Sequence, residues 1–562
     1  MFFLRAIEKV TALCNGQKIQ TLTKTNLQEG AIERVSRGAV ATAFPDATEA
    51  ALGILRAGGN AIDAAVAAAW ALSVCEPSGS GLGGQTTMLV RTGNGKVTVV
   101  DGHSHAPALA SLNNISKSAQ RVGYRACTIP STVATLGYAH RKWGVLSLGR
   151  VMEPAIALAE EGYAITRLHR RQTKWVTGYL NASPATARLF LRNGTAPEVG
   201  EIFRQKELAW TLRRVASQGA DDFYRGEIAA LICEDMREHG GLITEGDLKN
   251  FNLPVEREPL SIGYRGHRIV TVPPPGGGLN LLLALKVMEH LPADVKDAAS
   301  WHEYVAETMF EVFRERKRLP VGPAEPTASL VESLIGNGHA KEIADCILRR
   351  RTRRNASEFS SLIQPAGITG DYEPGDTTHL SVTDEEGDIV SLTQSIQSLF
   401  GAKVANAKLG FLYNNYLYTC PRDEHPYQLG SRSMPRSNVS PTIVFSGMPG
   451  NDPPVLALGA AGSRRITSSV LQVISGVLDR RVSLQAAVDA PRIHALLSRK
   501  VWIEKPAACE ELTDRLHRRF RKVIVKSSHD YKMGAVQAIG FDENGEMYAA
   551  ADPRRDGVSA IL

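Results

Sequence analysis

The feature that most constrains the fold is a stretch well inside the chain, GDTTHLSVTDEEGDIVSL at residues 375–392. From Thr377 onward, apolar residues alternate with polar ones, and a similar pattern resumes after a turn at residues 384–387. Alternation with a period of two on both sides of an acidic, glycine-containing turn is typical of a β-hairpin. We therefore expect a buried hairpin with two threonines and a histidine, residues 377–379, at its front edge.

Helical and strand patterns share the rest of the chain. Residues 46–74 predict two helices broken at Gly58 and Gly59, and the second is so rich in alanine that it must pack closely on its neighbours. Further helices are expected at 278–291 and 466–478, and further strands at 410–415, 440–445 and 454–459. Strands inside and helices outside indicate an α+β fold built as a layered sandwich.

Composition excludes several classes of protein. With 562 residues, 43% of them hydrophobic and 22% charged, the chain can bury a large core and has the composition of a soluble globular protein. The net charge of +7 is dispersed except for LRRRTRRN at 348–355, which we interpret as a solvated loop because no aromatic residues interleave with it. We expect no nucleic-acid partner, and no membrane partner because no apolar stretch is long enough to span a bilayer.

Cysteine and glycine patterns argue against a metal or a cofactor. The seven cysteines occur singly, without a CxxC pair, which favours reduced thiols in a cytoplasmic setting and argues against a structural zinc site. The glycine-rich stretches at 79–86 and 272–280 fit no phosphate-binding pattern. We interpret 79–86 as a structural glycine turn, with anion binding as its alternative, and 272–280 as a close approach of backbone to backbone, and we expect no cofactor.

The front edge of the hairpin could carry nucleophilic chemistry. A threonine hydroxyl needs a base, and a threonine at a chain terminus supplies one from its own α-amino group. Cleavage just before Thr377 would create such a residue, with hydroxyls of Thr393 and Ser395 on the returning strand and the turn GAAGS at 459–463 as a source of oxyanion-binding N–H groups. A purely structural threonine stays the alternative on these residues alone, because threonine is common in strands.

Longer stretches resemble the γ-glutamyltranspeptidase family, N-terminal nucleophile hydrolases that are made as one precursor and split autocatalytically. The hairpin with GFLYNN resembles the start of the family's small subunit. From about residue 38 to the end, other matching pieces follow in the family's order, among them AVAT, GILRAGGNAIDAAVAAAWALSVCEPSGSGLGG, PPPGGGLNLL, PRSNVSPTIVF, GAAGSRRI and DPRRDG. The resemblance implies a four-layer αββα sandwich, cut into a large subunit, residues 1–376, and a small subunit, residues 377–562.

The resemblance also implies roles for individual residues. Thr377 matches the family nucleophile, and the scissile bond follows Asp376. Ser395 stands where the family usually has a threonine that hydrogen-bonds the nucleophile, so the hydroxyl is kept and the methyl group that restricts its rotamer is lost. Gly462 and Ser463 stand where two glycines usually supply the oxyanion-binding N–H groups.

The substrate pocket departs from the family pattern. His103 takes the place of the arginine that clamps the α-carboxylate of a γ-glutamyl group, and Thr419 takes that of the aspartate that holds the α-ammonium. A histidine is mostly neutral at pH 7 and cannot reproduce the bidentate fork of a guanidinium. The other expected substrate-binding residues are Gln397 in place of an asparagine, Ser437 and Asn438 in place of two serines, and Tyr416.

These residues predict a threonine amidohydrolase or acyltransferase that works through an acyl-enzyme on a small-molecule amide whose acyl group is not a standard γ-glutamyl. Arg436 and His103 are possible contacts for an anionic substrate, each with a structural role as its alternative. A true γ-glutamyltransferase or glutathione hydrolase with a remodelled clamp is one alternative function. Another is a binding protein that has lost catalysis, which only Ser395 and Ser463 favour.

Overall fold

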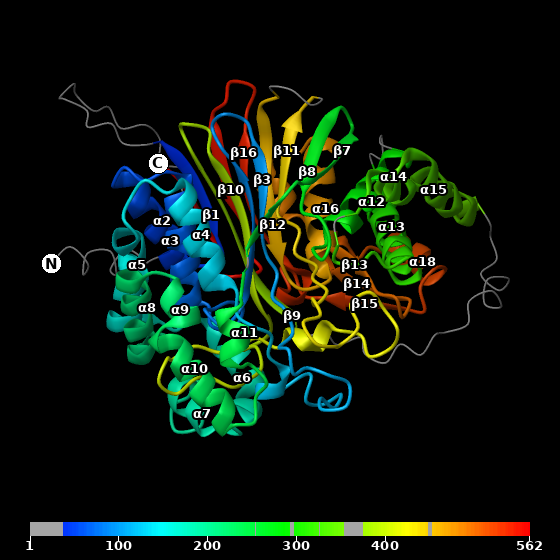
Figure 1. The fold of residues 1–562 in the computed structure, drawn as a ribbon. Coiled ribbons are helices and arrows are strands. Elements are labelled where there is room, and N and C mark those ends of the chain that lie inside the picture. The colour runs from blue at the N-terminus through cyan, green and yellow to red at the C-terminus, as the bar shows by residue number, and fades with distance from the viewer. Residues whose placement is uncertain (1–36, 253, 293–296, 325, 353–374, 448–451) are drawn as a thin grey trace, which may run out of the picture. The chain divides into compact units, whose positions relative to one another are not determined.

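Two antiparallel sheets form the centre of the fold in the computed structural model (Figure 1). The structure describes residues 37–252, 254–292, 297–324, 326–352, 375–447 and 452–562. Within these ranges the first sheet has the strand order β18 (Val558–Ile561), β1 (Gly38–Thr42), β9 (Gly375–Asp384), β10 (Ile389–Ser398), β2 (Gln85–Arg91), β3 (Val97–Gly102) and β6 (Val255–Arg257). The second has the order β17 (Met547–Ala551), β16 (Ala535–Phe541), β12 (Pro454–Ala461), β11 (Thr442–Ser446), β8 (His267–Thr271) and β7 (Leu260–Tyr264).

Helices cover the outer face of each sheet. Those between the first strand and β7 are α2 (Pro45–Arg56), α3 (Ala61–Cys75), α4 (Thr132–Trp143), α5 (Leu148–Glu161), α6 (Arg167–Asn181), α7 (Pro184–Phe190), α8 (Lys206–Gln218), α9 (Asp221–Arg225), α10 (Glu227–Glu238) and α11 (Glu245–Lys249). The later ones are α12 (Gly278–Glu289), α13 (Ala298–Arg318), α14 (Ala328–Ile335), α15 (Asn337–Thr352), α16 (Arg465–Leu478), α17 (Leu484–Asp489) and α18 (Glu510–His517). Figure 1 shows α2 to α5 on one side of the sheets and α12, α13 and α16 on the other.

Smaller elements complete the description. Two minor sheets pair β4 (Tyr163–Ala164) with β5 (Ile202–Phe203), and β13 (Ile493–Ala495) with β14 (Lys500–Glu504) and β15 (Lys522–Lys526). Short 3-10 turns lie at η1 (Tyr124–Ala126), η3 (Tyr416–Thr419), η4 (Lys505–Ala507) and η5 (Tyr531–Met533). No helix in the described ranges combines the length and apolarity that crossing a bilayer requires.

Alternation along the strands separates three apolar layers. Leu380 and Val382 of β9 point into the core beneath α3, whereas Leu89 of β2 and Ile389 of β10 meet Ile443 of β11 between the sheets. A third core joins the second sheet to α12, α13 and α16. Because each strand sends successive side chains to opposite faces, these layers make the four-layer αββα sandwich expected from the sequence.

The predicted hairpin is the β9–β10 pair, and it is confirmed. Its side chains at odd positions of β9 face the second sheet: the His379 ring lies against Gly459 of β12, and Ser381 Oγ donates to the Gln537 carbonyl 3.2 Å away in β16. At the turn, a carboxylate oxygen of Asp384 accepts the Ala61 N–H at 2.7 Å, the first backbone donor of α3. The turn residue therefore caps the alanine-rich helix that packs beneath the hairpin.

Two sequence-based expectations about elements are wrong. Residues 410–415 do not form a strand but make isolated bridges, Tyr413 with Gly83 and Leu412 with Ala405. The arginine run at 348–355 is not a solvated loop over its described part, because residues 348–352 belong to α15. Residues 353–355 lie outside the described ranges.

Candidate active site

Thr377 lies near the start of β9 and is only 4% exposed. Its Oγ1 donates to the carbonyl oxygen of the preceding residue, Asp376, at 2.7 Å and lies 3.2 Å from Ser395 Oγ. Ser395 Oγ lies 2.9 Å from the same carbonyl oxygen. The hydroxyl of Thr377 is thus held beside the peptide bond that the sequence marks for cleavage, with a second hydroxyl touching the same carbonyl.

A β-bulge begins where Ser395 lies opposite Thr377. The register of β9 and β10 shifts between Gln394 and Gln397, and Gln397 has φ +81°. Ser395 Oγ accepts the Gln397 N–H at 2.9 Å, which fixes the serine side chain. Bulges commonly re-aim side chains near functional sites. Gly84 lies behind this bend, where an added Cβ would stand 2.4 Å from the Ser395 carbonyl oxygen, so only glycine fits.

The other expected hydroxyl does not reach the nucleophile. Thr393 Oγ1 lies 2.9 Å from Nδ1 of His379, the register partner of Thr393 across the hairpin. Burial lowers the pKa of His379 to about 3, so this imidazole is neutral. Thr393 and His379 therefore belong to the polar layer between the sheets rather than to the site.

The expected oxyanion loop connects β12 to α16. Gly462 has φ +127° and Ser463 has φ +58°, so the backbone turns sharply just before the helix. The Ser463 side chain lies against Gly375, where an added Cβ would be 2.4 Å from Ser463 Cβ. The loop therefore packs against Gly375, two positions before Thr377 in the chain. It also lies at the N-terminal end of the 14-residue helix α16, where the partial positive charge of the helix end stabilises a developing oxyanion.

His103 follows β3, and its ring lies against the buried carboxylate of Asp101. Its Nδ1 lies 2.6 Å from Asp101 Oδ1, and the other carboxylate oxygen of Asp101 accepts from the Arg257 guanidinium at 2.9 Å. Burial alone would raise the pKa of Asp101, but His103 and Arg257 hold it well below its usual range. His103 Nε2 is buried and has no hydrogen-bond partner within the described part of the chain. His103 can therefore offer a substrate one ring nitrogen, but not an arginine-like fork.

Tyr416 and Thr419 lie on the turn η3. Burial raises the pKa of Tyr416 strongly, while nearby side chains of Ser395 and Ser437 act in the opposite direction. Thr419 Oγ1 donates to the Tyr416 carbonyl at 3.0 Å, and the Thr419 carbonyl accepts from Arg436 Nε at 3.2 Å. The position that carries an aspartate in the family pattern thus has a guanidinium beside it.

Ser437 and Asn438 are anchored from the opposite side. The Ser437 N–H donates to the Pro275 carbonyl at 3.0 Å, and Gly277 approaches so closely that an added Cβ would lie 2.6 Å from the Asn438 carbonyl oxygen. Arg316 of α13 donates to the Asn438 side-chain oxygen and, at 3.0 Å, to the Ser437 carbonyl. The PPPGGG turn is therefore the close backbone approach that the sequence predicted.

Gln397 differs from the other expected contacts. Its side-chain oxygen accepts from the neighbouring Ser398 Oγ, which in turn accepts from Asn415 Nδ2 at 3.0 Å. Gln397 is thus tied into the bulge by neighbouring side chains.

Sequence reasoning missed a buried network around Asp376. The Asp376 carboxylate pairs with Arg555, accepts the Thr377 N–H at 2.9 Å and accepts from Gln172 Nε2 at 3.2 Å. Arg555 also pairs with Glu76 at 2.6 Å. Burial raises the pKa of Glu76 to about 7, opposed by Arg555 and reinforced by Asp376. The only signal for this network was the second arginine of DPRRDG, which lies 179 positions after Asp376.

Comparisons with known proteins agree with this fold and site. A family model described as Gamma-glutamyltranspeptidase matches residues 47–562. The chain is 32% identical over 546 residues to a glutathione hydrolase proenzyme of Escherichia coli (strain K12), covering 93% of this chain and 91% of that one. It is also 32% identical over 554 residues to an acylase ACY 1 proenzyme of Pseudomonas sp. (strain SE83), covering 94% of each.

A solved structure shows the same architecture. The crystal structure of cephalosporin acylase from Bacillus halodurans superposes with a TM-score of 0.81 at 28% identity and covers 97% of this chain and 99% of that one. The family match extends over nearly all of the chain and includes both strands of the hairpin. The chain therefore belongs to the γ-glutamyltranspeptidase family of N-terminal nucleophile hydrolases.

Proposed function

We propose that this chain is a proenzyme that cleaves itself between Asp376 and Thr377 and then acts as a threonine amidohydrolase or acyltransferase. The observation that carries the proposal is the placement of Thr377 Oγ1 against the Asp376 carbonyl, with Ser395 beside both. Attack of Oγ1 on the Asp376 carbonyl carbon would form an ester as the C–N bond breaks and the nitrogen takes up the proton. Water would then hydrolyse the ester, leaving a carboxylate on Asp376 and a free amine on Thr377.

The same groups then suit catalysis on a substrate amide. The new α-amino group of Thr377 would accept the proton of its own hydroxyl as that hydroxyl attacks a substrate carbonyl. Backbone N–H groups of Gly462 and Ser463, close to Gly375, would stabilise the oxyanion. Departure of the amine leaves an acyl ester on Thr377, which water or another amine would release.

We propose further that the preferred acyl group lacks an α-ammonium. Arg436 Nε lies 3.2 Å from the Thr419 carbonyl, so the place where the family pattern has an aspartate is next to a positive charge. A guanidinium there repels an ammonium and attracts a carboxylate. The name acylase carried by relatives such as the Pseudomonas sp. (strain SE83) protein is consistent with an acyl group other than γ-glutamyl.

A glutathione hydrolase or γ-glutamyltransferase is the second candidate. The name of the Escherichia coli relative favours it, and Arg436 could hold the α-carboxylate that the missing arginine holds in the family pattern. The two candidates differ in whether the pocket accepts a positively charged ammonium on the α-carbon of the acyl group.

Two measurements test the proposal. Mass spectrometry and denaturing electrophoresis of wild type should show two fragments that meet at Asp376 and Thr377, whereas Thr377→Ala should remain one chain. A single uncut wild-type chain without activity would instead support the binding-protein alternative, and a full-length chain that is nonetheless active would contradict the mechanism.

Specificity is tested with a matched pair, glutaryl and γ-glutamyl p-nitroanilide, which differ only in the α-ammonium. We expect kcat/KM for the glutaryl compound to be higher on the order of a hundredfold, because removing one partner of a buried charge pair costs about 2 to 5 kcal/mol. The double variant His103→Arg, Thr419→Asp should shift the ratio toward γ-glutamyl. A wild-type preference for γ-glutamyl would favour the second candidate.

A further inference from the structure

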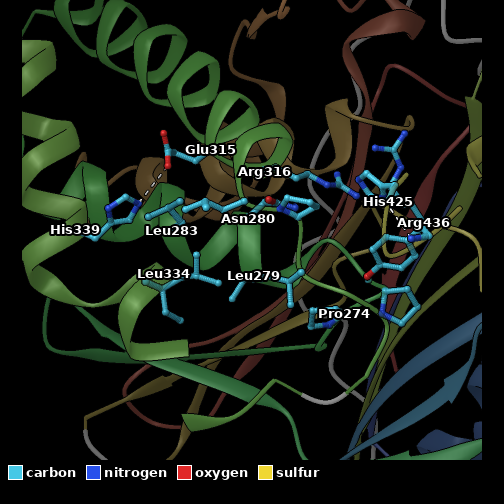
Figure 2. Close-up of a pocket in the computed structure, with 17 residues that line it drawn as sticks. Pro274, Leu279, Asn280, Leu283, Glu315, Arg316, Leu334, His339, His425 and Arg436 are labelled. Atoms are coloured by element: carbon cyan, nitrogen blue, oxygen red, sulfur yellow. Dashed lines mark hydrogen bonds and ion pairs between the residues drawn. The ribbon is translucent and has the colours of Figure 1, made fainter. Parts of the chain in front are cut away.

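Figure 2 shows a pocket whose lining includes Arg436, the residue that donates to the Thr419 carbonyl at the candidate site. It is formed where the turn at 273–276, helices α12 to α15 and the segment around His425 meet. The link to the site is direct: Pro275, which lines the pocket, accepts the N–H of Ser437, and Arg436 is the next residue back along the chain.

The walls of this pocket differ in character from end to end. Figure 2 shows Arg316, His425 and Arg436 together at one end. The middle is apolar and includes Leu279, Leu283 and Leu334. The other end holds Glu315 and His339, whose Oε2 and Nε2 atoms lie 3.7 Å apart. We call this space the side chamber.

The charge at the mouth of the side chamber comes from its two arginines. Burial, together with Arg436 and Arg316, lowers the pKa of His425, so this imidazole is neutral near pH 7. Arg316 is held in place by its hydrogen bonds to Asn438 and Ser437. A guanidinium fixed in this way loses little further freedom when it binds a carboxylate.

We propose that the side chamber is a subsite for a carboxylate attached to an apolar group, with the carboxylate beside Arg316 and Arg436 and the apolar part among Leu279, Leu283 and Leu334. This inference rests on the proposed function, since it assigns to the side chamber one half of the amide substrate. The two possible sources are the acyl half and the amine half, which share this chemistry.

Binding is tested without catalysis on Thr377→Ala, because the structure shows the side chamber in the uncut chain. Calorimetry with N-acetyl-L-leucine, N-acetyl-L-leucinamide and acetate should show the first binding about tenfold or more tightly than the other two, since only it has both the charge and the apolar group. Equal binding of N-acetyl-L-leucine and its amide, or no binding, would overturn the inference.

A variant places the ligand. Leu279→Trp fills the side chamber and should weaken N-acetyl-L-leucine about tenfold or more. The matched control Leu330→Trp, on α14 at a position that is 39% exposed and outside the lining, should leave it unchanged. Melting curves identify variants that do not fold. If Leu279→Trp is one of them, the comparison of the three ligands on Thr377→Ala alone still tests the inference.

Kinetics on the mature enzyme distinguish the two sources. One pair of amides shares its acyl group and carries leucine or leucinamide as the amine; the other shares p-nitroaniline and carries a glutaryl or butanoyl group. Leu279→Trp should raise KM for the carboxylate-bearing member of one pair only. That pair identifies which half of the amide substrate, acyl or amine, binds in the side chamber. If every amide is refused while N-acetyl-L-leucine still binds, the proposed function fails, and the side chamber is a carboxylate-binding site without a role as a substrate subsite. If amides are cleaved and Leu279→Trp changes no KM, the inference fails and the function stands.

Discussion

Ser395 illustrates how one hydroxyl can organise a nucleophile. Its Oγ accepts the Gln397 N–H and lies within hydrogen-bond distance of Thr377 Oγ1 and the Asp376 carbonyl oxygen, and its single proton can be donated to only one of these two oxygens at a time. Ser395→Ala should slow self-cleavage and lower kcat, each by about ten- to a hundredfold. The Thr377 hydroxyl would lose its hydrogen-bond partner while the strand pairing around it stays in place.

The matched variant for this prediction is Ser395→Thr, which keeps the hydroxyl and restricts its rotamer. We expect it to cleave itself at least as fast as wild type. Rates of fragment formation followed by electrophoresis measure both variants. Equal rates for Ser395→Ala and wild type would show that Ser395 supports the bulge only.

Arg555 is expected to position the scissile peptide rather than to react. Arg555→Met would leave Asp376 and Glu76 buried without the cation that pairs with both. Since the Asp376 carboxylate also accepts the Thr377 N–H, self-cleavage should slow by about tenfold or more. Cleavage rate measured on folded protein separates this effect from stability.

Two variants serve as controls for Arg555. Arg555→Lys should recover part of the rate because it keeps the charge. Arg213→Met removes an arginine that is 60% exposed and paired with Glu160, and it should leave cleavage unchanged. Normal cleavage by Arg555→Met would contradict the positioning role.

The sequence predicted which residues come together at the site far better than it predicted the contacts that hold these residues in place. Thr377 and Ser395 stand on the two strands of one hairpin, which alternation and turn chemistry predicted, but Thr393, also expected beside the nucleophile, contacts His379 instead. The contacts of Asp376 with Arg555 and of Asn438 with Arg316 join positions 179 and 122 residues apart. Local patterns carry no signal for such pairs, since they arise only when the layers pack.

At the scale of elements, α13 shows why the arginine run was misread. Glu303, Glu307, Glu311 and Glu315 recur every four residues on one face of this helix and are buried. Arg350 of α15 pairs with Glu311, and Arg351 pairs with Glu303 at 3.1 Å. A basic run without aromatic residues looks solvated in isolation, but a glutamate repeat on an earlier helix, α13, gives two of its arginines buried partners.

The same helix gives a pH dependence. Burial raises the pKa of Glu307 to about 7. The nearby Glu311 and Glu303 also raise this pKa, whereas Arg350 and Arg519 lower it. Between about pH 4.5 and 7, the Glu307 carboxyl is therefore protonated in the folded state and ionised in the unfolded chain. The contribution of the protonated carboxyl to the free energy of unfolding is fully present below this range and is lost as the pH rises through it. Chemical denaturation should show Glu307→Gln gaining on wild type from about pH 5 to about pH 7.5.

The control for this titration is Glu153→Gln, whose side chain is 61% exposed and pairs with Arg150 on the surface of α5. Its stability relative to wild type should not change over the same pH range. A constant difference between Glu307→Gln and wild type would mean that Glu307 keeps its ordinary pKa.

At the scale of the whole molecule, the two halves of the chain are interleaved in both main sheets. β1, β2, β3 and β6 come from before the expected cut, and β9, β10 and β18 from after it. In the second sheet, β7 and β8 come from before it, and β11, β12, β16 and β17 from after it. β9 pairs with β10 over most of its length and with β1 at residues 381–384, so the strand that the new terminus begins would stay paired with its sheet.

This interleaving predicts that cleavage leaves one particle. Separating residues 1–376 from 377–562 would break the β1–β9 and β10–β2 ladders of the first sheet and the β8–β11 ladder of the second, and would expose the apolar cores on both sides. A tag at the C-terminus of the cleaved protein should therefore retain both fragments on an affinity matrix in native buffer and release the large one in denaturant. Thr377→Ala should elute from size exclusion at the volume of the cleaved wild type and give one band on a denaturing gel where wild type gives two. Recovery of the tagged small fragment alone from native buffer would contradict the strand pairing described here.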